Sequence, residues 1–367
     1  MLIAAHMSGL VDAGAADRES DYWCPACQQP VVLHHGSQIP PHFAHHPQTP
    51  CHLAGEGETR QHLLGKRQLA TFFSDWGPVT LERILPAIQQ RADGWLDLPQ
   101  PVALEFQCSP ISRAAVAQRT AGYRRIACYP FWLLGSRYAQ QKLNWRLIER
   151  FACWLTGWDL CLLFWEVDQN RLRVAHHLRQ TATGAYINET VWVTTLSELV
   201  AGPTPCTTVV RNPGQKQYRS YLNQALRRAT PTLRPIQEAL YLTGHQVTGF
   251  PDCLMTTTLT APIFGQGLIL WRIVLTTWIE EQADMTFLTL AELSQRALLL
   301  VNGRTTAVRF DGRSAFRQEQ RKLLTLLTQA GILRPTTQGW RVYGHLKWSR
   351  DYADWLENDE KNGCYFT

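Results

Sequence analysis

One short segment restricts the fold of this chain more than any other. Residues Val102–Gln107 read Val-Ala-Leu-Glu-Phe-Gln, so the segment is nearly all apolar with a glutamate inside it. A strand that is apolar on both faces is usually central in a sheet covered on both sides. A carboxylate in the middle of such a strand is costly to bury unless it is paired or binds a metal ion. The segment therefore predicts a covered central strand whose Glu105 has an ionic or metal partner.

The segments around this strand predict a compact α/β unit. An apolar stripe at helical spacing indicates a helix over 56–73, and the pattern changes to that of strands over 79–98. A helix over 111–122 and a buried strand over 131–134 follow. This order predicts a mixed sheet flanked by helices, which occupies residues 56–140.

The rest of the chain has a mainly helical pattern. We therefore expect a helical C-terminal region over 141–367, with a break near residues 200–212 where prolines are frequent. Its segment Arg317–Val342 combines an apolar helix with a hairpin that contains a turn glycine. Two interpretations stay open for this segment, the end of a winged-helix unit and an ordinary helix–hairpin corner.

Residues 1–55 are rich in Cys, His, Pro and Gly and show little periodicity. We predict a small zinc-binding domain here, because zinc takes four nitrogen or sulfur ligands in a tetrahedron. Four protein ligands leave no open position, so the metal is expected to be structural. The set contains Cys24 and Cys27 and is completed either by His45 with Cys51 or by two histidines. The five candidate ligands are Cys24, Cys27, His42, His45 and Cys51.

The ten cysteines do not predict disulfides. The first residues lack the basic segment and long apolar run of a secretory signal peptide. Apolar runs such as Leu268–Val274 are interrupted by Arg272 and are too short to span a bilayer. We therefore expect a cytoplasmic protein without a membrane partner, in which clustered cysteines are metal ligands.

Basic residues are concentrated in two stretches that contain no Asp or Glu, 107–148 and 199–237, although the formal net charge is only +6. Such stretches suit the phosphate backbone of DNA, because each phosphate contact releases condensed counterions. A solvated protein face or arginines used in packing would explain the same pattern equally well.

Acidic side chains on neighbouring strands predict a second metal site. Asp93 lies near the end of one predicted strand and Glu105 lies inside the next. Two carboxylates on adjacent strands can converge on one Mg²⁺, which prefers oxygen ligands. Gln107 points to the same face as Glu105, because side chains alternate along a strand. The alternative is a surface pair of Arg91 with Asp93 and a Glu105 paired to a core arginine.

The preceding helix carries further candidates for this site. Glu58, His62 and Lys66 are spaced four residues apart and share one helix face. Together with Asp93 and the Glu-x-Gln of the central strand, they resemble the PD-(D/E)xK nuclease pattern. That pattern has lysine where this chain has Gln107. Glutamine cannot act as a general base or neutralise a phosphate, so it could only orient the attacking water or hold a metal ligand. Whether the site cuts DNA or only binds it stays open.

These residues together resemble the competence protein CoiA family, from residue 23 to residue 135. The resemblance implies a metal-dependent nuclease core that acts on DNA during natural transformation and recombination. It also implies that Asp93, Glu105 and Gln107 form the nuclease triad, assisted by Glu58 and His62. The motifs that carry it are Cys24-Pro-x-Cys27, His42-Phe-Ala-His45, Glu58-x3-His62-x3-Lys66, Arg91-Ala-Asp93, Leu104-Glu-Phe-Gln-x-Ser109, Arg119-x3-Tyr123 and Trp132-Leu-Leu-Gly135.

The leading hypothesis is a Mg²⁺- or Mn²⁺-dependent deoxyribonuclease whose metal is held by Asp93 and Glu105 and whose substrate is single-stranded or branched DNA. The alternative is a catalytically inactive DNA-binding adaptor that recruits recombination proteins. Arg119 and Tyr123 resemble the Gln-x3-Tyr element of RecB-type nucleases. The predicted DNA-binding residues are Lys66, Arg91, Arg113, Arg119, Tyr123, Arg124, Arg125, Lys216, Arg219, Arg227 and Arg228.

Overall fold

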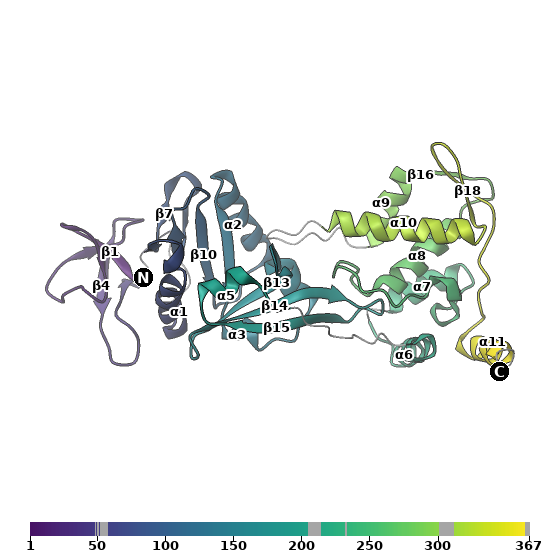
Figure 1. Cartoon of the computed structure of the whole chain (residues 1–367), viewed down its shortest axis with the longest axis horizontal. Helices are drawn as coiled ribbons and strands as arrows, with labels where there is room; N and C mark the ends of the chain where they lie inside the picture. Colours follow the sequence, from purple (N-terminus) through teal and green to yellow (C-terminus); the bar gives the residue numbers. More distant parts are fainter. Residues whose placement is uncertain are drawn as a thin grey trace. The chain divides into compact units, whose positions relative to one another are not determined.

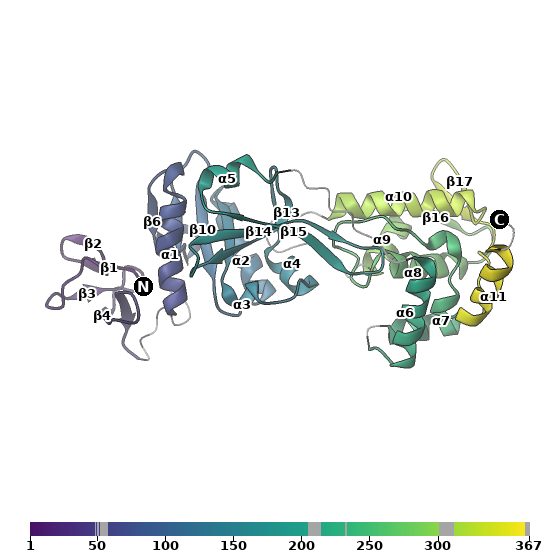
Figure 2. The same ribbon diagram turned by 60° about the horizontal axis from the view of Figure 1, so that its bottom comes forward.

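The computed structural model describes residues 1–47, 49, 51, 58–204, 214–231, 233–300 and 312–363. The chain forms two compact units, each with its own elements (Figure 1; Figure 2). The described residues of the first unit are in 1–177 and 188–204, and those of the second are in 178–187 and from 214 onward. Most of the predicted break near 200–212 lies outside the described residues, because 205–213 are not among them.

The N-terminal part of the first unit is a small five-stranded antiparallel sheet in the order β2-β1-β3-β4-β5. Tyr22 and Phe43 are buried between its strands, with their ring centroids 4.8 Å apart. The strands are too short to produce a recognisable alternation of apolar and polar residues, so they could not be predicted from the sequence pattern. They are β1 (Ile3–His6), β2 (Gly9–Asp12), β3 (Tyr22–Trp23), β4 (Pro30–His34) and β5 (His42–His45).

The rest of the first unit is built on a mixed sheet with the order β15-β14-β13-β11-β10-β9-β6, in which β12 also pairs with β13. The central strand β10 runs parallel to β11 and antiparallel to β9, and Glu105 lies beside Trp132. The mixed sheet flanked by helices is thus confirmed. Its strands are β6 (Val79–Leu81), β9 (Gly94–Leu96), β10 (Val102–Gln107), β11 (Tyr129–Leu134), β12 (Cys153–Leu155), β13 (Asp159–Glu166), β14 (Arg171–Gln180) and β15 (Tyr186–Val193).

Helix α1 (Arg60–Phe72) packs closely on strand β10. A Cβ atom at Gly65 would overlap the Phe106 ring, so only glycine permits this approach. The helix begins where the Thr59 hydroxyl accepts a hydrogen bond from the His62 amide at 3.2 Å. The other α-helices and strands described in this unit are β7 (Ile84–Leu85), β8 (Gln90–Arg91), α2 (Arg113–Arg125), α3 (Ser136–Ala139), α4 (Trp145–Phe151) and α5 (Leu196–Ala201).

The expectation of a mainly helical chain from residue 141 is wrong for residues 153–193. Strands β12 to β15 lie there and extend the mixed sheet. Strand β13 reads Asp-Leu-Cys-Leu-Leu-Phe-Trp-Glu and is buried on both faces. An apolar run without alternation cannot be told from a buried helix by its periodicity, which explains the error.

The second unit is mainly helical and contains a three-stranded antiparallel sheet in the order β16-β18-β17. Helix α8 is apolar on nearly all sides and is buried accordingly. No helix among the described residues is both long and apolar enough to cross a membrane. The elements are α6 (Gln215–Arg227), α7 (Arg234–Leu242), α8 (Leu268–Glu280), β16 (Phe287–Thr289), α9 (Leu290–Leu300), α10 (Arg313–Gln329), β17 (Leu333–Pro335), β18 (Gly339–Val342) and α11 (Tyr352–Gly363).

Candidate functional site

Three cysteines and one histidine converge in the N-terminal sheet. The ligand atoms of Cys24, Cys27, His45 and Cys51 all lie within 4.8 Å of one another. The sulfurs of Cys24 and Cys51 are 4.0 Å apart, and Cys27 Sγ is 3.3 Å from His45 Nε2. With Zn–S bonds of about 2.3 Å, a tetrahedral site separates two sulfurs by roughly 3.8 Å. The group therefore has the composition and spacing of a closed metal site.

The electrostatics of this group also favour a cation. Burial raises the pKa of Cys27 to about 11, and the nearby Cys24 and Cys51 act in the same direction. Three thiolates in one place would repel one another unless a positive ion held them. The fifth candidate, His42, is not in the group. His42 and His45 are three residues apart on strand β5, so their side chains face opposite sides of the sheet. The Nδ1 atom of His42 lies 2.9 Å from the Pro40 carbonyl oxygen.

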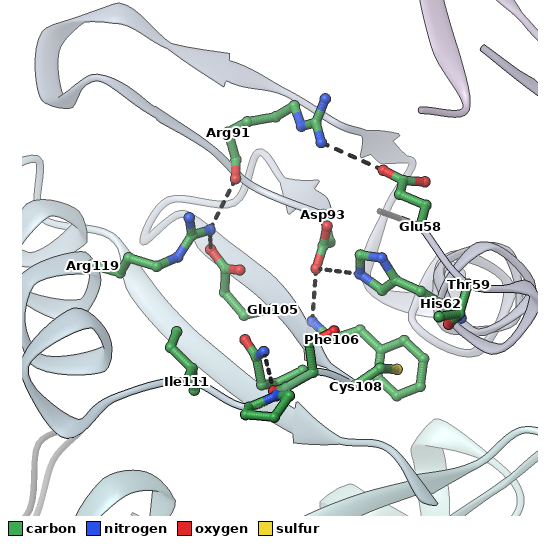
Figure 3. A pocket seen from close by; sticks show the side chains of 13 residues that line it. Glu58, Thr59, His62, Arg91, Asp93, Glu105, Phe106, Cys108, Ile111 and Arg119 are labelled. Atoms are coloured by element: carbon green, nitrogen blue, oxygen red, sulfur yellow. Dashed lines mark hydrogen bonds and ion pairs between the residues drawn. The ribbon is translucent and has the colours of Figure 1, made fainter. Parts of the chain in front are cut away.

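The carboxylates predicted as a nuclease site line one cleft of the first unit (Figure 3). Its water-accessible volume is about 200 Å³. The walls are the start of helix α1, the residues between β8 and β9, the end of β10 and the following loop, and one arginine of α2. The predicted site residues that line it are Glu58, His62, Arg91, Asp93, Glu105, Gln107 and Arg119.

Asp93 is held as a carboxylate by neighbours from two elements. It directly precedes strand β9, and its Oδ2 accepts hydrogen bonds from the Phe106 amide at 2.9 Å and from His62 Nε2 at 3.2 Å. Burial by itself would raise the pKa of Asp93, but His62 and Lys66 and the Phe106 amide outweigh it and hold the pKa well below its usual range. Both hydrogen bonds fall on Oδ2, so Oδ1 is left for a further ligand.

Glu105 lies on the central strand in a different environment. Its Oε1 accepts hydrogen bonds from Arg119 and from the Tyr123 hydroxyl, both on helix α2. Burial raises the pKa of Glu105 above its ordinary value, and Asp93 adds to this, although Arg119 opposes it. Both carboxyl groups line the same cleft. Here too the hydrogen bonds leave the second oxygen, Oε2, for another partner.

Gln107 lies at the edge of the same cleft, on the side of β10 that carries Glu105. Its amide nitrogen donates a hydrogen bond to the Ser109 carbonyl oxygen at 2.7 Å. This contact orients the amide group and leaves the side-chain oxygen as an acceptor. The arrangement is compatible with holding a water molecule, and it provides no positive charge for a phosphate.

Beneath the cleft is an ionic network that the sequence did not reveal. Lys66 Nζ is completely buried, donates to both oxygens of Glu58 at 2.9 Å and contacts Glu82. Arg91 Nη2 lies 3.4 Å from Glu58 Oε1. Burial alone would raise the pKa of Glu82, but Lys66 and Arg91 lower it to about 2. Glu58 thus lines the cleft with both oxygens already paired, which limits its use as a third metal ligand.

The predicted DNA-binding residues occupy very different positions. Lys66, Tyr123 and Arg219 are buried, and Arg219 donates to the carbonyl oxygens of Thr248 and Phe250 at 2.6 Å. Arg91 and Arg119 line the cleft. The other predicted residues are exposed on helices α2 and α6 and remain candidates for a nucleic-acid surface. They are Arg113, Arg124, Arg125, Lys216, Arg227 and Arg228.

A second group that could hold a metal was also missed. His176, His177 and Glu189 place their ligand atoms within 4.8 Å of one another. Consecutive side chains of a regular strand face opposite sides of the sheet, so two histidines adjacent in the sequence did not predict a shared metal site. The backbone of His177 has φ 50°, and its Nδ1 lies 2.7 Å from Nδ1 of His176. Burial lowers the pKa of His176, which favours the neutral imidazole that binds metals.

Two protein-family models match this chain. The model of the CoiA nuclease-like domain matches residues 58–199, which contain the cleft and most of the mixed sheet. The model of the CoiA N-terminal domain matches residues 12–54, which contain the Cys3His group. The fold and the cleft therefore belong to a nuclease-like domain that follows a metal-binding segment.

The two matches together span just over half of the chain, which belongs to the competence protein CoiA family. The competence protein CoiA of Bacillus subtilis (strain 168) is 30% identical over 140 residues, which is 35% of this chain and 37% of that protein. The chain thus aligns with little more than a third of that relative. No solved structure matches this chain.

Proposed function

We propose that the first unit is a Mg²⁺- or Mn²⁺-dependent deoxyribonuclease that processes DNA during natural transformation. The observation that supports this most strongly is the placement of Asp93 and Glu105 in one cleft of a nuclease-like domain. Each carboxylate uses one oxygen for hydrogen bonds within the protein, which leaves Asp93 Oδ1 and Glu105 Oε2 as hard oxygen donors in the same cleft. Oxygen donors of this kind fit Mg²⁺ and Mn²⁺.

The roles of the surrounding residues follow from their contacts. Bound at Asp93 and Glu105, Mg²⁺ or Mn²⁺ supplies activation of water and stabilisation of negative charge on phosphate. His62 and the Phe106 amide fix the orientation of Asp93, while Arg119 and Tyr123 fix that of Glu105. Gln107, whose amide is tied to Ser109, would accept a hydrogen bond from the attacking water. His62 is one-fifth exposed, so it can reach a phosphate at the mouth of the cleft.

For the N-terminal group we propose a structural zinc ion. Three sulfur ligands and one imidazole fit zinc, because thiolates prefer this metal to Mg²⁺ or Mn²⁺. All four positions of a tetrahedron are then filled by Cys24, Cys27, His45 and Cys51, so this ion would take no part in chemistry.

The second candidate function is a DNA-binding adaptor without catalysis. Two observations favour it. Gln107 stands where the nuclease pattern has lysine, and Arg119 neutralises Glu105 without any metal. An adaptor of this kind would recruit recombination proteins, and its cytoplasmic location remains a prediction from the sequence.

Cleavage of end-labelled DNA distinguishes the two functions. The wild type is incubated with single-stranded and double-stranded DNA, with Mg²⁺, with Mn²⁺ and without divalent metal. We expect cutting that requires metal, and a loss of at least a hundredfold in Glu105→Gln and in Asp93→Asn, because each substitution removes a charged metal ligand. Asp97→Asn is the matched control, since Asp97 is 74% exposed and lies outside the cleft.

Metal-dependent cutting by wild type and Asp97→Asn alone would support the nuclease. Equal cutting by all four proteins would contradict it, because the activity would then come from elsewhere. DNA binding by all four proteins without any cutting would favour the adaptor.

A further inference from the structure

The second unit contains a sequence of elements that neither the nuclease chemistry nor the family comparisons use. From α8 onward the order is helix, strand, helix, helix, strand, strand, formed by α8, β16, α9, α10, β17 and β18. The three strands form one antiparallel sheet with β18 in the centre, and Leu288 of β16 lies beside Trp340 of β18. This is the element order and strand order of winged-helix domains, in which the third helix and the final hairpin contact DNA.

The three helices pack as one body, which places α10 in the position of a recognition helix. Trp271 of α8 packs edge-on against Phe316 of α10 at 6.0 Å, and its indole N–H donates to the Ala297 carbonyl oxygen of α9 at 3.2 Å. Ser294 of α9 donates to the Gln320 side chain of α10 at 3.1 Å. Figure 1 shows α10 lying along this unit, with the strand β18 beside its C-terminal end.

The outward face of α10 has the composition of a surface that contacts nucleic acid. It presents basic residues together with amide and hydroxyl groups, and all of them are exposed: Arg313, Ser314, Arg317, Gln318, Arg321, Lys322, Thr325 and Gln329. Glu319 is the only acid of the helix, and it is buried against Arg272 and Lys322. In the described part of the chain, Arg317 and Arg321 have no acidic group within 4 Å.

The dimensions of this face fit double-stranded DNA. Arg313, Arg317 and Arg321 follow one another at intervals of four residues, so they lie along one side of the helix. At a rise of 1.5 Å per residue they cover about 12 Å along the helix axis, and the diameter of a helix with its side chains, about 10–12 Å, matches the width of the DNA major groove, about 12 Å. Guanidinium and amide groups are also the side chains that most often read base edges in that groove.

The hairpin after α10 carries a second pair of positive charges. Arg334 of β17 and Arg341 of β18 are directly opposite each other and both are exposed. Like charges at directly opposed positions are unfavourable in an isolated sheet. No ion pair joins either arginine to an acid of the described residues; Arg334 stacks on the Tyr343 ring and Arg341 donates to the Met285 carbonyl oxygen. A polyanion beside the hairpin would compensate both charges.

We propose that α10 and the β17–β18 hairpin form a separate binding surface for double-stranded DNA, with α10 in the major groove and the hairpin on the phosphate backbone. This surface would deliver duplex DNA to the protein whether or not the cleft in the first unit cuts it. It goes beyond the proposed nuclease, since it requires no metal and none of the cleft residues.

The test is a titration of the full-length protein against a fluorescent DNA duplex and, separately, against one of its single strands. Binding is monitored by fluorescence anisotropy without divalent metal, so that nothing can be cut. We expect the double substitution Arg317→Ala with Arg321→Ala to weaken duplex binding at least tenfold. The slope of log affinity against log salt should also fall by about two, one for each lost phosphate contact. The conservative pair Arg317→Lys with Arg321→Lys should retain most of the affinity.

Arg234→Ala is the control for the loss of a positive charge outside the α10 face, and Arg234 pairs with Glu238 in the native protein. Arg234 is 72% exposed on helix α7 of the same unit and is not part of the α10 face. All these side chains lie on the surface, so circular dichroism and melting should be unchanged. Duplex affinity within twofold of wild type in the double variant, or an equal loss in Arg234→Ala, would overturn the proposal. A loss for single strands that is as large as the loss for duplexes would overturn the assignment to duplex DNA.

Discussion

Replacement of Lys66 by methionine should destabilise the helix and strands that form the floor of the cleft. Lys66 is fully buried and neutralises Glu58 and Glu82, whose side chains are 9% and 2% exposed. The substitution roughly keeps the volume of the side chain but removes the cation that contacts both carboxylates. Glu82 then loses its direct ion-pair partner, while Glu58 keeps Arg91 and the Met1 α-amino group. Breaking a buried ion pair by removing one partner typically costs about 3–5 kcal/mol.

The pKa of Glu82 gives an independent magnitude. Burial alone would raise this pKa, but Lys66 and Arg91 lower it to about 2, against an ordinary value of about 4.3. At 1.36 kcal/mol per pH unit this difference is of the same order as the cost of breaking a buried ion pair, about 3–5 kcal/mol. We therefore expect Lys66→Met to reduce the local stability by about 3 kcal/mol at pH 7.

Hydrogen exchange measured by mass spectrometry can follow this region within the full chain, which has two units and need not unfold in one step. A loss of 3 kcal/mol corresponds to roughly a hundredfold faster exchange of amides in α1 and β10. Arg67→Met is the matched control, because its ion pair with Asp12 is about one-third exposed and is worth at most about 1 kcal/mol.

The effect also has a defined pH dependence. The folded pKa of Glu82 is depressed, so its contribution is fully present above about pH 4.3 and is lost as the pH falls toward 2. The difference between wild type and Lys66→Met should therefore be largest near neutral pH and should shrink under acid conditions. Exchange in Lys66→Met that is no faster than in Arg67→Met at pH 7 would refute this account of the network.

Two further predictions concern the metal group and the contact between α1 and β10. Cys27→Ser should lower the zinc content measured by plasma mass spectrometry by one ion per chain, whereas His42→Ala should leave it unchanged; equal losses would contradict the four-ligand set. Gly65→Ala should destabilise the first unit by roughly 1–3 kcal/mol, because the new methyl group overlaps Phe106. Gly36→Ala, which meets open space, should change stability little in the same melting experiment.

Much of the site could be predicted because its residues stand in short motifs on strongly patterned elements. The run Val102–Gln107 coincides with strand β10, and the alternation of side chains places Glu105 and Gln107 on one face. The Cys-x2-Cys spacing likewise indicated a metal site, although the sequence alone did not decide which four of the five candidate residues form it. The structure brings Asp93, Glu105 and His62 into one cleft, and their catalytic roles stay predictions.

What the sequence could not show depends on burial and on backbone shape. Lys66, Tyr123 and Arg219 look like exposed polar residues in the sequence, but tertiary packing places them inside the protein. Glu82 becomes visible as a partner only once Lys66 is known to be buried. The cluster at His176 depends on a left-handed backbone at His177, which no pattern of residue types predicts.

The most direct test of the central claim is a titration of the protein with Mn²⁺, in which the electron paramagnetic resonance signal of the free ion reports how much Mn²⁺ is bound. Wild-type protein with its N-terminal metal in place is compared with Asp93→Asn and with the exposed control Asp97→Asn. We predict that wild type and Asp97→Asn bind Mn²⁺ at one site that Asp93→Asn loses. Undiminished binding by Asp93→Asn, or no binding by wild type, would contradict a catalytic metal between Asp93 and Glu105.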